Sequence, residues 1–235
     1  MSLYLIIMGV QGAGKGTQAA YIHETYNVPH VSTGDLFRAM KTRTDDLARE
    51  VQAIMKSGNL VSDEVTNKVL QDRLEQDDAA DGVILDGYPR NIDQAKWLEN
   101  YLGGKGESLA AVLLLELDYY TAFKRAFGRV KDGKTGQVYN IYSTTDELDA
   151  AFIEDPNGKF QPRIEATLKS TGQILERRAD DHAGSVVKRI DTFEATTKPL
   201  IDYYEDKGLL VRINAKQPIE EVSAAVKAAI DQVKA

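Results

Sequence analysis

Residues 9–18 read Gly-Val-Gln-Gly-Ala-Gly-Lys-Gly-Thr-Gln, and they directly follow the apolar run Leu-Tyr-Leu-Ile-Ile-Met at residues 3–8. A glycine-rich loop between a buried strand and a helix points backbone N–H groups into one concavity, and the helix N-terminus adds positive partial charge. Lys15 adds a full charge there. The stretch matches the phosphate-loop pattern G-x-x-x-x-G-K-[ST], except that Gly16 separates Lys15 from the hydroxyl of Thr17. It predicts a cradle for the phosphates of a nucleotide.

Apolar segments recur along the chain and alternate with charged stretches of helical period. We expect strands buried on both faces at residues 3–8, 28–31, 83–85, 111–117 and 209–213. Strands that alternate with helices form a parallel sheet covered on both sides. The sequence therefore predicts an α/β fold: a P-loop NTPase-type parallel β-sheet flanked by helices.

Four residues mark the expected starts of helices. Ser62, Asn91 and Asp118 are predicted N-caps, because their side-chain oxygens can accept hydrogen bonds from backbone N–H groups of the first turn. Pro218 suits the first turn of the last helix.

Two regions interrupt the alternation of strands and helices. Residues 32–62 hold short helical pieces, and residues 130–178 are rich in Gly, Lys, Thr and Asp, with apolar alternation only at residues 138–142. Long interruptions of this kind are usually functional insertions, such as lids, or disordered segments. The predicted division is a core of residues 1–31, 62–127 and 182–235, an insertion at 32–61 and a lid at 128–181.

The composition excludes several classes of protein. Hydrophobic residues make up 43% and charged residues 28% of the chain, as in soluble globular proteins. No apolar run approaches the ~20 residues of a membrane span, and no basic leader precedes the first strand, so we expect neither a membrane segment nor an export signal. The chain has no cysteine and a net charge of −7, which argue against disulfides and against a broad nucleic-acid surface.

Two polar stretches that contain an arginine follow predicted strands: Ser-Thr-Gly-Asp-Leu-Phe-Arg at 32–38 and Asp-Gly-Tyr-Pro-Arg-Asn-Ile-Asp-Gln at 86–94. A third polar stretch, Gly-Asn-Leu-Val-Ser-Asp-Glu, lies at 58–64. Ligands of parallel α/β folds collect at the carboxyl ends of strands. Each stretch alone is typical of an ordinary turn. Together, behind a phosphate loop, they indicate a ligand site.

These motifs resemble those of the adenylate kinases with a long lid, over roughly residues 3–222, with residues 140–168 the weakest part. The GAGKGTQ loop, the STGD-x-x-R turn, the G-x-LV-x-DE segment and the LDG[FY]PR-x-x-x-Q stretch recur in that family at about these spacings. The resemblance implies reversible transfer of the γ-phosphoryl of MgATP to AMP, which gives two ADP. It also implies a cytoplasmic monomer whose partners are ATP and AMP or ADP, with no nucleic acid and no membrane.

The resemblance further implies a role for each matching residue. It places in the ATP site Gly12, Ala13, Gly14, Lys15, Gly16, Thr17, Arg125, Arg129, Val138, Tyr139 and Gln217. It places in the AMP site Thr33, Arg38, Asn59, Leu60, Val61, Gly87, Arg90, Gln94, Arg178 and Arg189. The implied catalytic cations are Lys15, Arg90, Arg129, Arg178 and Arg189. Asp86 would hold Mg²⁺ through water.

The chain departs from the family pattern at the phosphate loop and in the lid. Gln11 stands where the family often has proline, which predicts a less rigid loop with the same donor atoms. Some relatives bind zinc in the lid through two pairs of cysteines. The matching positions here are Asp132, Thr135, Leu168 and Thr171, and leucine cannot be a ligand. We therefore expect a zinc-free lid that rests on polar hydrogen bonds and on packing by Val138, Tyr139, Ile141 and Tyr142.

Two alternatives remain open from the sequence. A uridylate/cytidylate kinase would share the enzyme class, although Thr33 and the long lid favour adenine. A P-loop switch without phosphotransfer would explain the loop but not the arginines Arg38, Arg90, Arg125, Arg129, Arg178 and Arg189 together. Phosphoryl transfer needs many cations to position and neutralise phosphates, and the planar guanidinium group suits that task.

Overall fold

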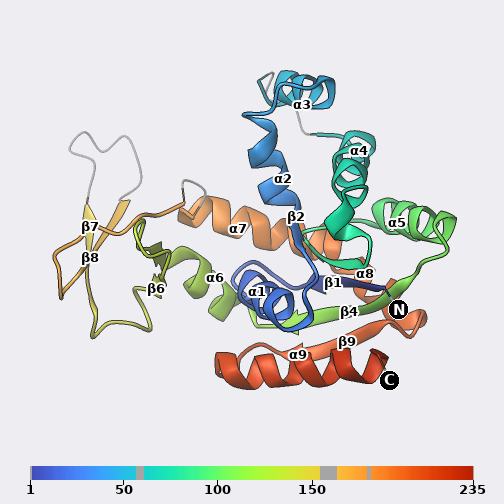
Figure 1. The fold of residues 1–235 in the computed structure, drawn as a ribbon. Helices are drawn as coiled ribbons and strands as arrows, with labels where there is room; N and C mark the ends of the chain where they lie inside the picture. Colours follow the sequence, from blue (N-terminus) through green and yellow to red (C-terminus); the bar gives the residue numbers. More distant parts are fainter. Residues whose placement is uncertain (1, 57–60, 154–162, 179–180, 235) are drawn as a thin grey trace. The chain divides into compact units, whose positions relative to one another are not determined.

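The computed structural model describes residues 2–56, 61–153, 163–178 and 181–234 (Figure 1). Two compact units divide the chain. The first comprises Met1–Gly9, Gly14–Leu117 and Phe193–Ala235, and the second comprises Val10–Ala13 and Asp118–Thr192. Among the described helices, none is both long and apolar enough to cross a membrane.

The first unit contains a five-stranded sheet in the order β2-β3-β1-β4-β9, with every pair parallel. Its strands are β1 (Leu3–Met8), β2 (His30–Ser32), β3 (Gly82–Asp86), β4 (Leu109–Glu116) and β9 (Leu210–Asn214). Asp86 lies opposite both Ile7 and Ser32, so that β1, β2 and β3 end at nearly the same level. The loops that follow these three strands therefore leave from one edge of the sheet.

The sheet forms because its strands are apolar on both faces. All of β1 is buried, as is the stretch from Ala111 to Leu115 in β4. The five strands predicted from the sequence are present, with ends that differ by one or two residues, which is the usual uncertainty of strand boundaries. The predicted α/β fold with a parallel sheet flanked by helices is confirmed.

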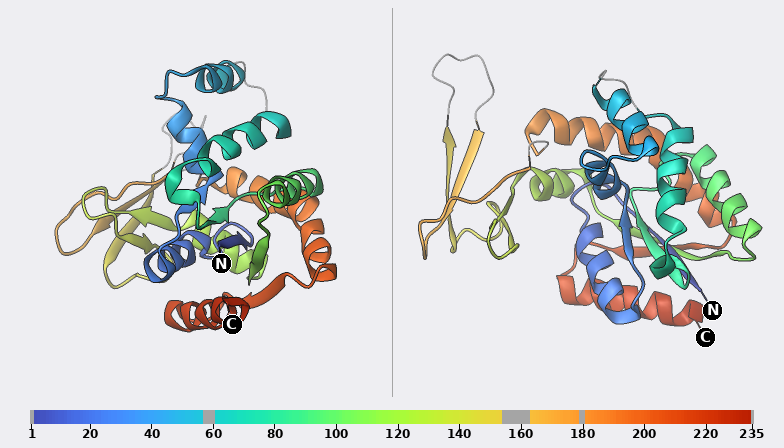
Figure 2. Two further views of the ribbon diagram at one scale, coloured as in Figure 1. Left: turned by 45° about the vertical axis from the view of Figure 1, so that its right-hand side comes forward. Right: turned by 45° about the horizontal axis from the view of Figure 1, so that its top comes forward.

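Helices cover both faces of this sheet. They are α1 (Lys15–Tyr26), α4 (Asp63–Leu74), α5 (Ile92–Gly104), α8 (Pro199–Asp206) and α9 (Ile219–Lys234), with short helical turns η1 (Asp77–Ala79) and η2 (Phe193–Thr197). Residues of α4, α5 and α8 pack with Tyr4, Ile6 and Met8 on one face. Helices α1 and α9 contact each other and the sheet on the opposite side, as Figures 1 and 2 show. Alternate side chains of β1 thus serve two separate cores.

The predicted helix caps are present. Ser62 accepts a hydrogen bond from the Val65 N–H at 3.3 Å, Asn91 from Gln94 at 2.9 Å and Asp118 from Thr121 at 2.9 Å. Pro218 lies one residue before α9 rather than inside its first turn, and its carbonyl accepts the N–H groups of Glu221 and Val222, both at 3.1 Å.

The described part of residues 32–62 contains helices α2 (Thr33–Met40) and α3 (Asp46–Lys56). These helices pack with α4 around a small core of their own, which consists of Met40, Ala48, Val51, Val65 and Val69. The short helical pieces predicted for this region are confirmed.

The second unit holds helices α6 (Tyr119–Phe127) and α7 (Ala183–Thr192), which contact each other, and two antiparallel strand pairs. The pairs are β5 (Arg129–Lys131) with β6 (Val138–Asn140), and β7 (Leu148–Ile153) with β8 (Arg163–Leu168). The apolar alternation noted at residues 138–142 includes β6. Strands β7 and β8 are not among the sequence predictions. β7 holds only the short run Ala-Ala-Phe-Ile at residues 150–153, and four consecutive residues of the strand are exposed. β8 alternates the buried residues Ile164, Ala166 and Leu168 with polar ones, a signal that sequence reasoning missed.

The described core of this unit contains Val130, Tyr139, Leu148, Ala166, Leu168 and Leu175, with Ile141 packed against it. Tyr139 and Ile141 therefore pack as predicted. Val138 is 59% exposed, so its predicted packing is wrong: Tyr139 alternates with it across β6 and takes the buried position. Tyr142 lies outside this core and is 41% exposed, but its ring centre lies 6.5 Å from that of Phe127, so it packs against α6 instead.

Candidate active site

The phosphate loop has the backbone geometry that its glycines predict. Gly12 has φ +92° and Gly14 has φ +94°, in the left-handed region that glycine adopts without strain. A Cβ on Gly12 would lie 2.4 Å from the carbonyl oxygen of Ala122, so no larger residue fits there. Lys15 opens α1, and its Nζ donates to the Gly9 carbonyl at 2.8 Å. The loop is thus shaped by close backbone approach.

The helix that follows the loop favours an anion at its start. The first turn of α1 carries no acidic side chain, so nothing there offsets the positive end of the helix. Gly16 and Thr17 in this turn are exposed, whereas Ala13 in the loop is buried. A phosphate can therefore meet the N–H groups and the Thr17 hydroxyl from the solvent side.

Three predicted AMP-site residues meet after β3. Thr33 Oγ1 and Arg90 Nε both donate to the carbonyl oxygen of Gly87, at 3.0 and 2.9 Å. Gly87 has φ +78°, and a Cβ on it would lie 2.8 Å from Thr33 Oγ1. The Arg90 side chain is exposed. The loop after β3 and the start of α2 therefore form one polar cluster with an accessible cation.

Gln94 is buried beside this cluster, and both the oxygen and the nitrogen of its amide are hydrogen-bonded. Its Oε1 accepts the Arg90 N–H at 2.8 Å, and its Nε2 donates to Asp63 Oδ1 at 2.6 Å. The other oxygen of Asp63 accepts from Asn91 Nδ2 at 2.9 Å. In the sequence Asp63 is only one residue of the polar stretch 58–64, since a carboxylate after a helix cap carries no sign of its partners 28 to 31 residues away.

The other AMP-site predictions lie on α2 and next to α4. Arg38 is exposed, and its Nε donates to Asp35 Oδ1 at 3.2 Å. Val61 is partly buried against the core shared by α2, α3 and α4. Asn59 and Leu60 lie outside the described residues.

Asp86, the predicted magnesium residue, ends β3 at the same edge as the phosphate loop. Its Oδ2 lies 3.4 Å from His30 Nε2, and its side chain is 17% exposed. Magnesium takes oxygen ligands and keeps several waters, so a carboxylate at this edge and the Thr17 hydroxyl are chemically suited to it. Within the described ranges, no group of three or more His, Cys, Asp or Glu side chains could hold a metal by itself.

In the second unit, Asp181 brings two of the predicted catalytic arginines together. Arg129 donates to Asp181 Oδ2 through Nε at 2.9 Å and Nη2 at 2.7 Å, and to Oδ1 through Nη2 at 2.8 Å. Arg189 Nη2 lies 3.3 Å from Oδ1. The Asp181 side chain is fully buried, while those of Arg129 and Arg189 are 24% and 32% exposed. Both cations therefore keep one side open to a ligand.

Arg177 supports this arrangement, although sequence analysis does not single it out. Its Nη2 donates to the backbone carbonyls of Asp181, at 2.7 Å, and Phe127, and its guanidinium lies 5.2 Å from the Phe127 ring centre. Burial lowers the pKa of Arg177 from its usual value. The neighbouring Arg178, which the sequence does predict, is exposed. Adjacent arginines thus differ in surroundings that one sequence cannot distinguish.

The residues predicted for the donor base are distributed over both units. Arg125 lies on α6, and its carbonyl accepts from Asn140 Nδ2 at 3.0 Å. Val138 and Tyr139 lie on β6, while Gln217 belongs to the first unit, is exposed and donates to Glu221 at 2.8 Å. Within the second unit, Asn140 thus links β6 to α6, the helix that carries Arg125.

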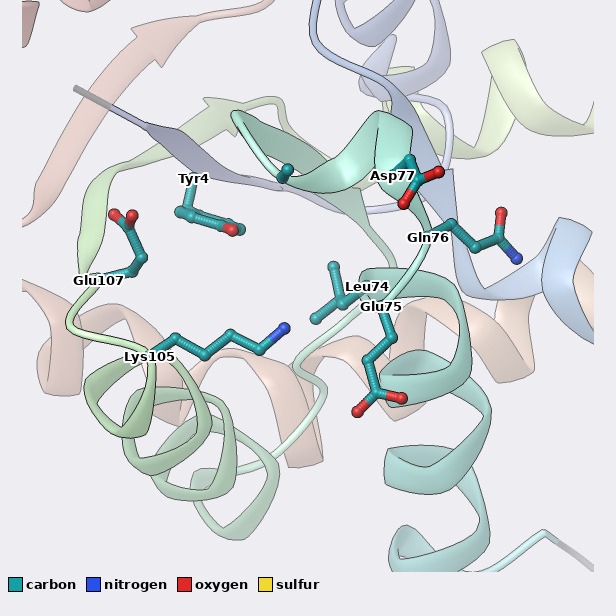
Figure 3. Close-up of a pocket in the computed structure, with 8 residues that line it drawn as sticks. Tyr4, Leu74, Glu75, Gln76, Asp77, Lys105 and Glu107 are labelled. Carbon is teal, nitrogen blue, oxygen red and sulfur yellow. The ribbon is translucent and has the colours of Figure 1, made fainter.

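A cavity of about 330 Å³ lies elsewhere on the first unit (Figure 3). It is lined by Tyr4, Leu74, Glu75, Gln76, Asp77, Ala80, Lys105 and Glu107. Tyr4 is near the start of β1, and Glu107 precedes β4, so the cavity is at the amino-terminal ends of these strands. It contains none of the predicted site residues.

Comparison with known proteins agrees with this geometry. The family model described as adenylate kinase matches residues 7–209. The chain belongs to the adenylate kinase family. It is 40% identical over 226 residues to an adenylate kinase of Thermoanaerobacter sp. (strain X514), which covers 96% of this chain and 97% of that protein. Adenylate kinases of Listeria monocytogenes serotype 4a (strain HCC23) and Shouchella clausii (strain KSM-K16) are 40% and 37% identical, over 95% and 98% of this chain and 96% and 99% of theirs.

Membership of the adenylate kinase family confirms the resemblance and the predicted enzyme class, an ATP:AMP phosphotransferase. The uridylate/cytidylate kinase and the P-loop switch are not favoured. The assignment of individual residues to the donor and acceptor sites stays a prediction.

Proposed function

We propose that the chain transfers the γ-phosphoryl group of MgATP to AMP with the residues predicted from its motifs, and that it runs the reaction in both directions. The observation that carries this proposal is the phosphate loop with Lys15 at the start of a parallel α/β fold of the adenylate kinase family. The phosphate of AMP is already an anionic nucleophile. The protein therefore has to position two nucleotides, neutralise charge and exclude water.

The cationic side chains act on different phosphates according to their position in the fold. Lys15 serves the donor phosphates from the phosphate loop. Arg90 and Arg38 hold the AMP phosphate, and Thr33, Gly87 and Gln94 shape the pocket for its base. Support comes from the Thr33–Gly87–Arg90 cluster, which places a polar wall and an exposed guanidinium at one strand end. Arg129, Arg178 and Arg189 act on the phosphates from the second unit.

Asp86 would hold, through water, the magnesium ion bound with ATP, and the Thr17 hydroxyl is available to that ion. The ion would supply positive charge to the donor phosphates. We further propose closure of residues 32–61 and 128–181 over the nucleotides, and action as a cytoplasmic monomer. The support for these points is the likeness to the family. The two insertions also carry arginines at or near their edges.

A coupled assay tests the proposal. Formation of ADP from MgATP is measured with AMP, CMP, UMP and GMP in parallel, and the donor is then changed to GTP. AMP should be the preferred acceptor. A preference for UMP or CMP would reassign the acceptor pocket, and nucleotide hydrolysis without AMP-dependent ADP formation would contradict the phosphotransfer itself.

A further inference from the structure

Gln11, in the phosphate loop, contacts the buried carboxylate that binds two of the proposed catalytic arginines. Its Nε2 lies 3.3 Å from Asp181 Oδ1, across 170 positions of sequence. Both residues belong to the second unit, because loop residues Val10–Ala13 group with Asp118–Thr192. The phosphate loop and the arginine cluster are therefore linked through one side-chain amide.

The orientation of this amide follows from the charge of Asp181. Gln11 Oε1 is buried and has no hydrogen-bond partner among the residues that the structure describes. A buried oxygen without a partner costs free energy, so the amide would turn if the opposite orientation were better. The opposite orientation would bring that oxygen against a carboxylate. The contact from Nε2 to Asp181 is thus the interaction that fixes the side chain.

The two oxygens of Asp181 are used differently. Oδ2 accepts only from Arg129 among the described donors, at 2.7 and 2.9 Å. Oδ1 is shared by Arg129 at 2.8 Å, by Arg189 at 3.3 Å and by Gln11 at 3.3 Å. Gln11 and Arg189 therefore stand at equal distance from one oxygen, and one of these two donors is neutral.

This sharing matters because the carboxylate is fully buried. A buried carboxylate needs donors, and it would resist the departure of Arg189 toward a phosphate if that guanidinium were indispensable to it. When Arg189 leaves Oδ1 for a phosphate, Arg129 at 2.8 Å and the neutral amide of Gln11 at 3.3 Å still donate to this oxygen. The amide also holds the carboxylate in the orientation that directs Arg129.

We propose that Gln11 is a positioning residue for phosphoryl transfer: it keeps Asp181 hydrogen-bonded and oriented while Arg129 and Arg189 act on the phosphates. The proposal rests on the roles proposed above for these two arginines. It assigns to Gln11 a task beyond the looser loop that the sequence predicts at this position.

Two substitutions of similar shape test the role. Gln11→Met removes the donor, and kcat should fall roughly 10-fold, the size expected for loss of a hydrogen bond to a charged group, while the KM values for ATP and AMP change little. Gln11→Glu should impair kcat at neutral pH, because an ionised carboxylate cannot donate to Asp181. Its kcat relative to wild type should rise as the pH falls, since a protonated carboxyl donates as the amide does.

The charged groups around this contact are the guanidinium groups of Arg129 and Arg189 on Asp181, Arg177 on its backbone carbonyl, and His182 next to it in the chain. All are present in both variants and in wild type. The kcat of Gln11→Glu divided by that of wild type therefore reports on the new carboxyl alone. The same kcat ratio for Gln11→Met should not change with pH. Gln232→Met, at an exposed position of α9, controls for the exchange itself.

A double-mutant cycle identifies the partner. If Gln11 acts through Asp181, adding Gln11→Met to Asp181→Asn should lower kcat no further. The proposal would be overturned if the fold-losses in kcat of the two single variants multiplied in the double variant. It would also be overturned if the kcat of Gln11→Glu relative to wild type did not change with pH. Arg129→Ala and Arg189→Ala show whether a failure concerns the proposed roles of the arginines or only the role of Gln11. If they retain full turnover, the proposed roles of the arginines fail. If they are impaired while Gln11→Met matches wild type with an unchanged melting temperature, only this inference fails.

Discussion

Asp132 and Asp181 are both buried carboxylates of the second unit, but they are held by different kinds of donor. Asp132 Oδ1 accepts from the backbone N–H groups of Lys134 at 2.7 Å and Thr135 at 3.4 Å, and from Gln173 Nε2 at 2.6 Å. Asp181 accepts from two arginines and one amide. The backbone N–H groups are held in place by the turn, so they cannot leave Asp132 for another acceptor. Arginines at a partly open surface can exchange a carboxylate for a phosphate.

The comparison teaches how one residue type serves two purposes in one unit. The partners of Asp132 are the backbone of its own turn and Gln173, which lies 41 residues away after β8, so the carboxylate fixes the turn and joins it to that segment. The partners of Asp181 come from the start of β5, from α7 and from the phosphate loop. We therefore expect changes at the first carboxylate to affect stability, and changes around the second to affect turnover.

The largest expected effect is on turnover. Arg129→Ala should lower kcat by about 100-fold or more, as does loss of one preorganised donor at a developing charge. Arg129→Lys keeps the charge but loses the bidentate guanidinium, so its kcat should lie between those of Arg129→Ala and wild type. Steady-state kinetics with MgATP and AMP measure both. Retention of more than a tenth of the wild-type kcat in Arg129→Ala would break the comparison.

Asp132→Ala should act on stability instead. It leaves two backbone N–H groups and the Gln173 amide without their acceptor, and the melting temperature should fall by several degrees in differential scanning calorimetry. Asp132→Asn retains one acceptor oxygen and should lose less. At temperatures well below melting, kcat should change far less than in Arg129→Ala. An equal loss of kcat in both would mean that the two carboxylates do not differ in purpose.

Lowering the pH should reduce the stability that Asp132 contributes. Hydrogen bonds, chiefly from the Lys134 N–H, lower the pKa of Asp132 in the folded state. A lowered pKa contributes stability above the unfolded value of about 4, and this contribution is lost as the pH falls through the folded value. The stability advantage of wild type over Asp132→Asn should hold at pH 6 to 7 and shrink below about pH 4. Urea unfolding across this range measures it, and an advantage that grows on acidification would contradict the assigned pKa direction.

The smallest expected effect is that of metal removal. The oxygen of Asp132 that faces the turn is occupied by its three donors, and Leu168, at another of the positions matching zinc ligands, is buried in the apolar core. A zinc-selective chelator should leave the melting temperature unchanged, and elemental analysis should find no stoichiometric zinc. One zinc per chain would show that the lid is aligned wrongly with its relatives.

Much of the fold can be predicted from the sequence because its signals are local. The buried strands are continuous apolar runs, and the caps at Ser62, Asn91 and Asp118 act within one turn. Strands β7 and β8 carry weaker signals, since most of β7 is exposed and β8 shows only the alternation of Ile164, Ala166 and Leu168. The two strands form because residues far apart in the sequence, such as Leu148 and Leu168, pair with each other, and the sequence pattern does not show which residues will pair.

The site divides in the same way. Lys15 and the strand-end arginines belong to motifs with fixed spacing, so a sequence identifies them as candidates. Asp63, Asp181 and Arg177 do not, because each acquires its meaning from partners far away in the chain. An aspartate in a charged stretch is usually solvated, and its burial becomes evident only in three dimensions.

The position of β9 has a consequence for how the chain is made. It pairs with β4 from Val112–Leu210 to Glu116–Asn214, and the stretch that forms the second unit, Asp118–Thr192, is synthesised between them. Until residue 210 leaves the ribosome, the Leu-Ala-Ala-Val-Leu-Leu-Leu-Glu strand β4 has β1 on one side and an open edge on the other. An apolar open edge is a template for pairing with another chain. A nascent chain that pauses within the second unit therefore exposes an apolar strand edge, and completion of the C-terminus covers it with β9.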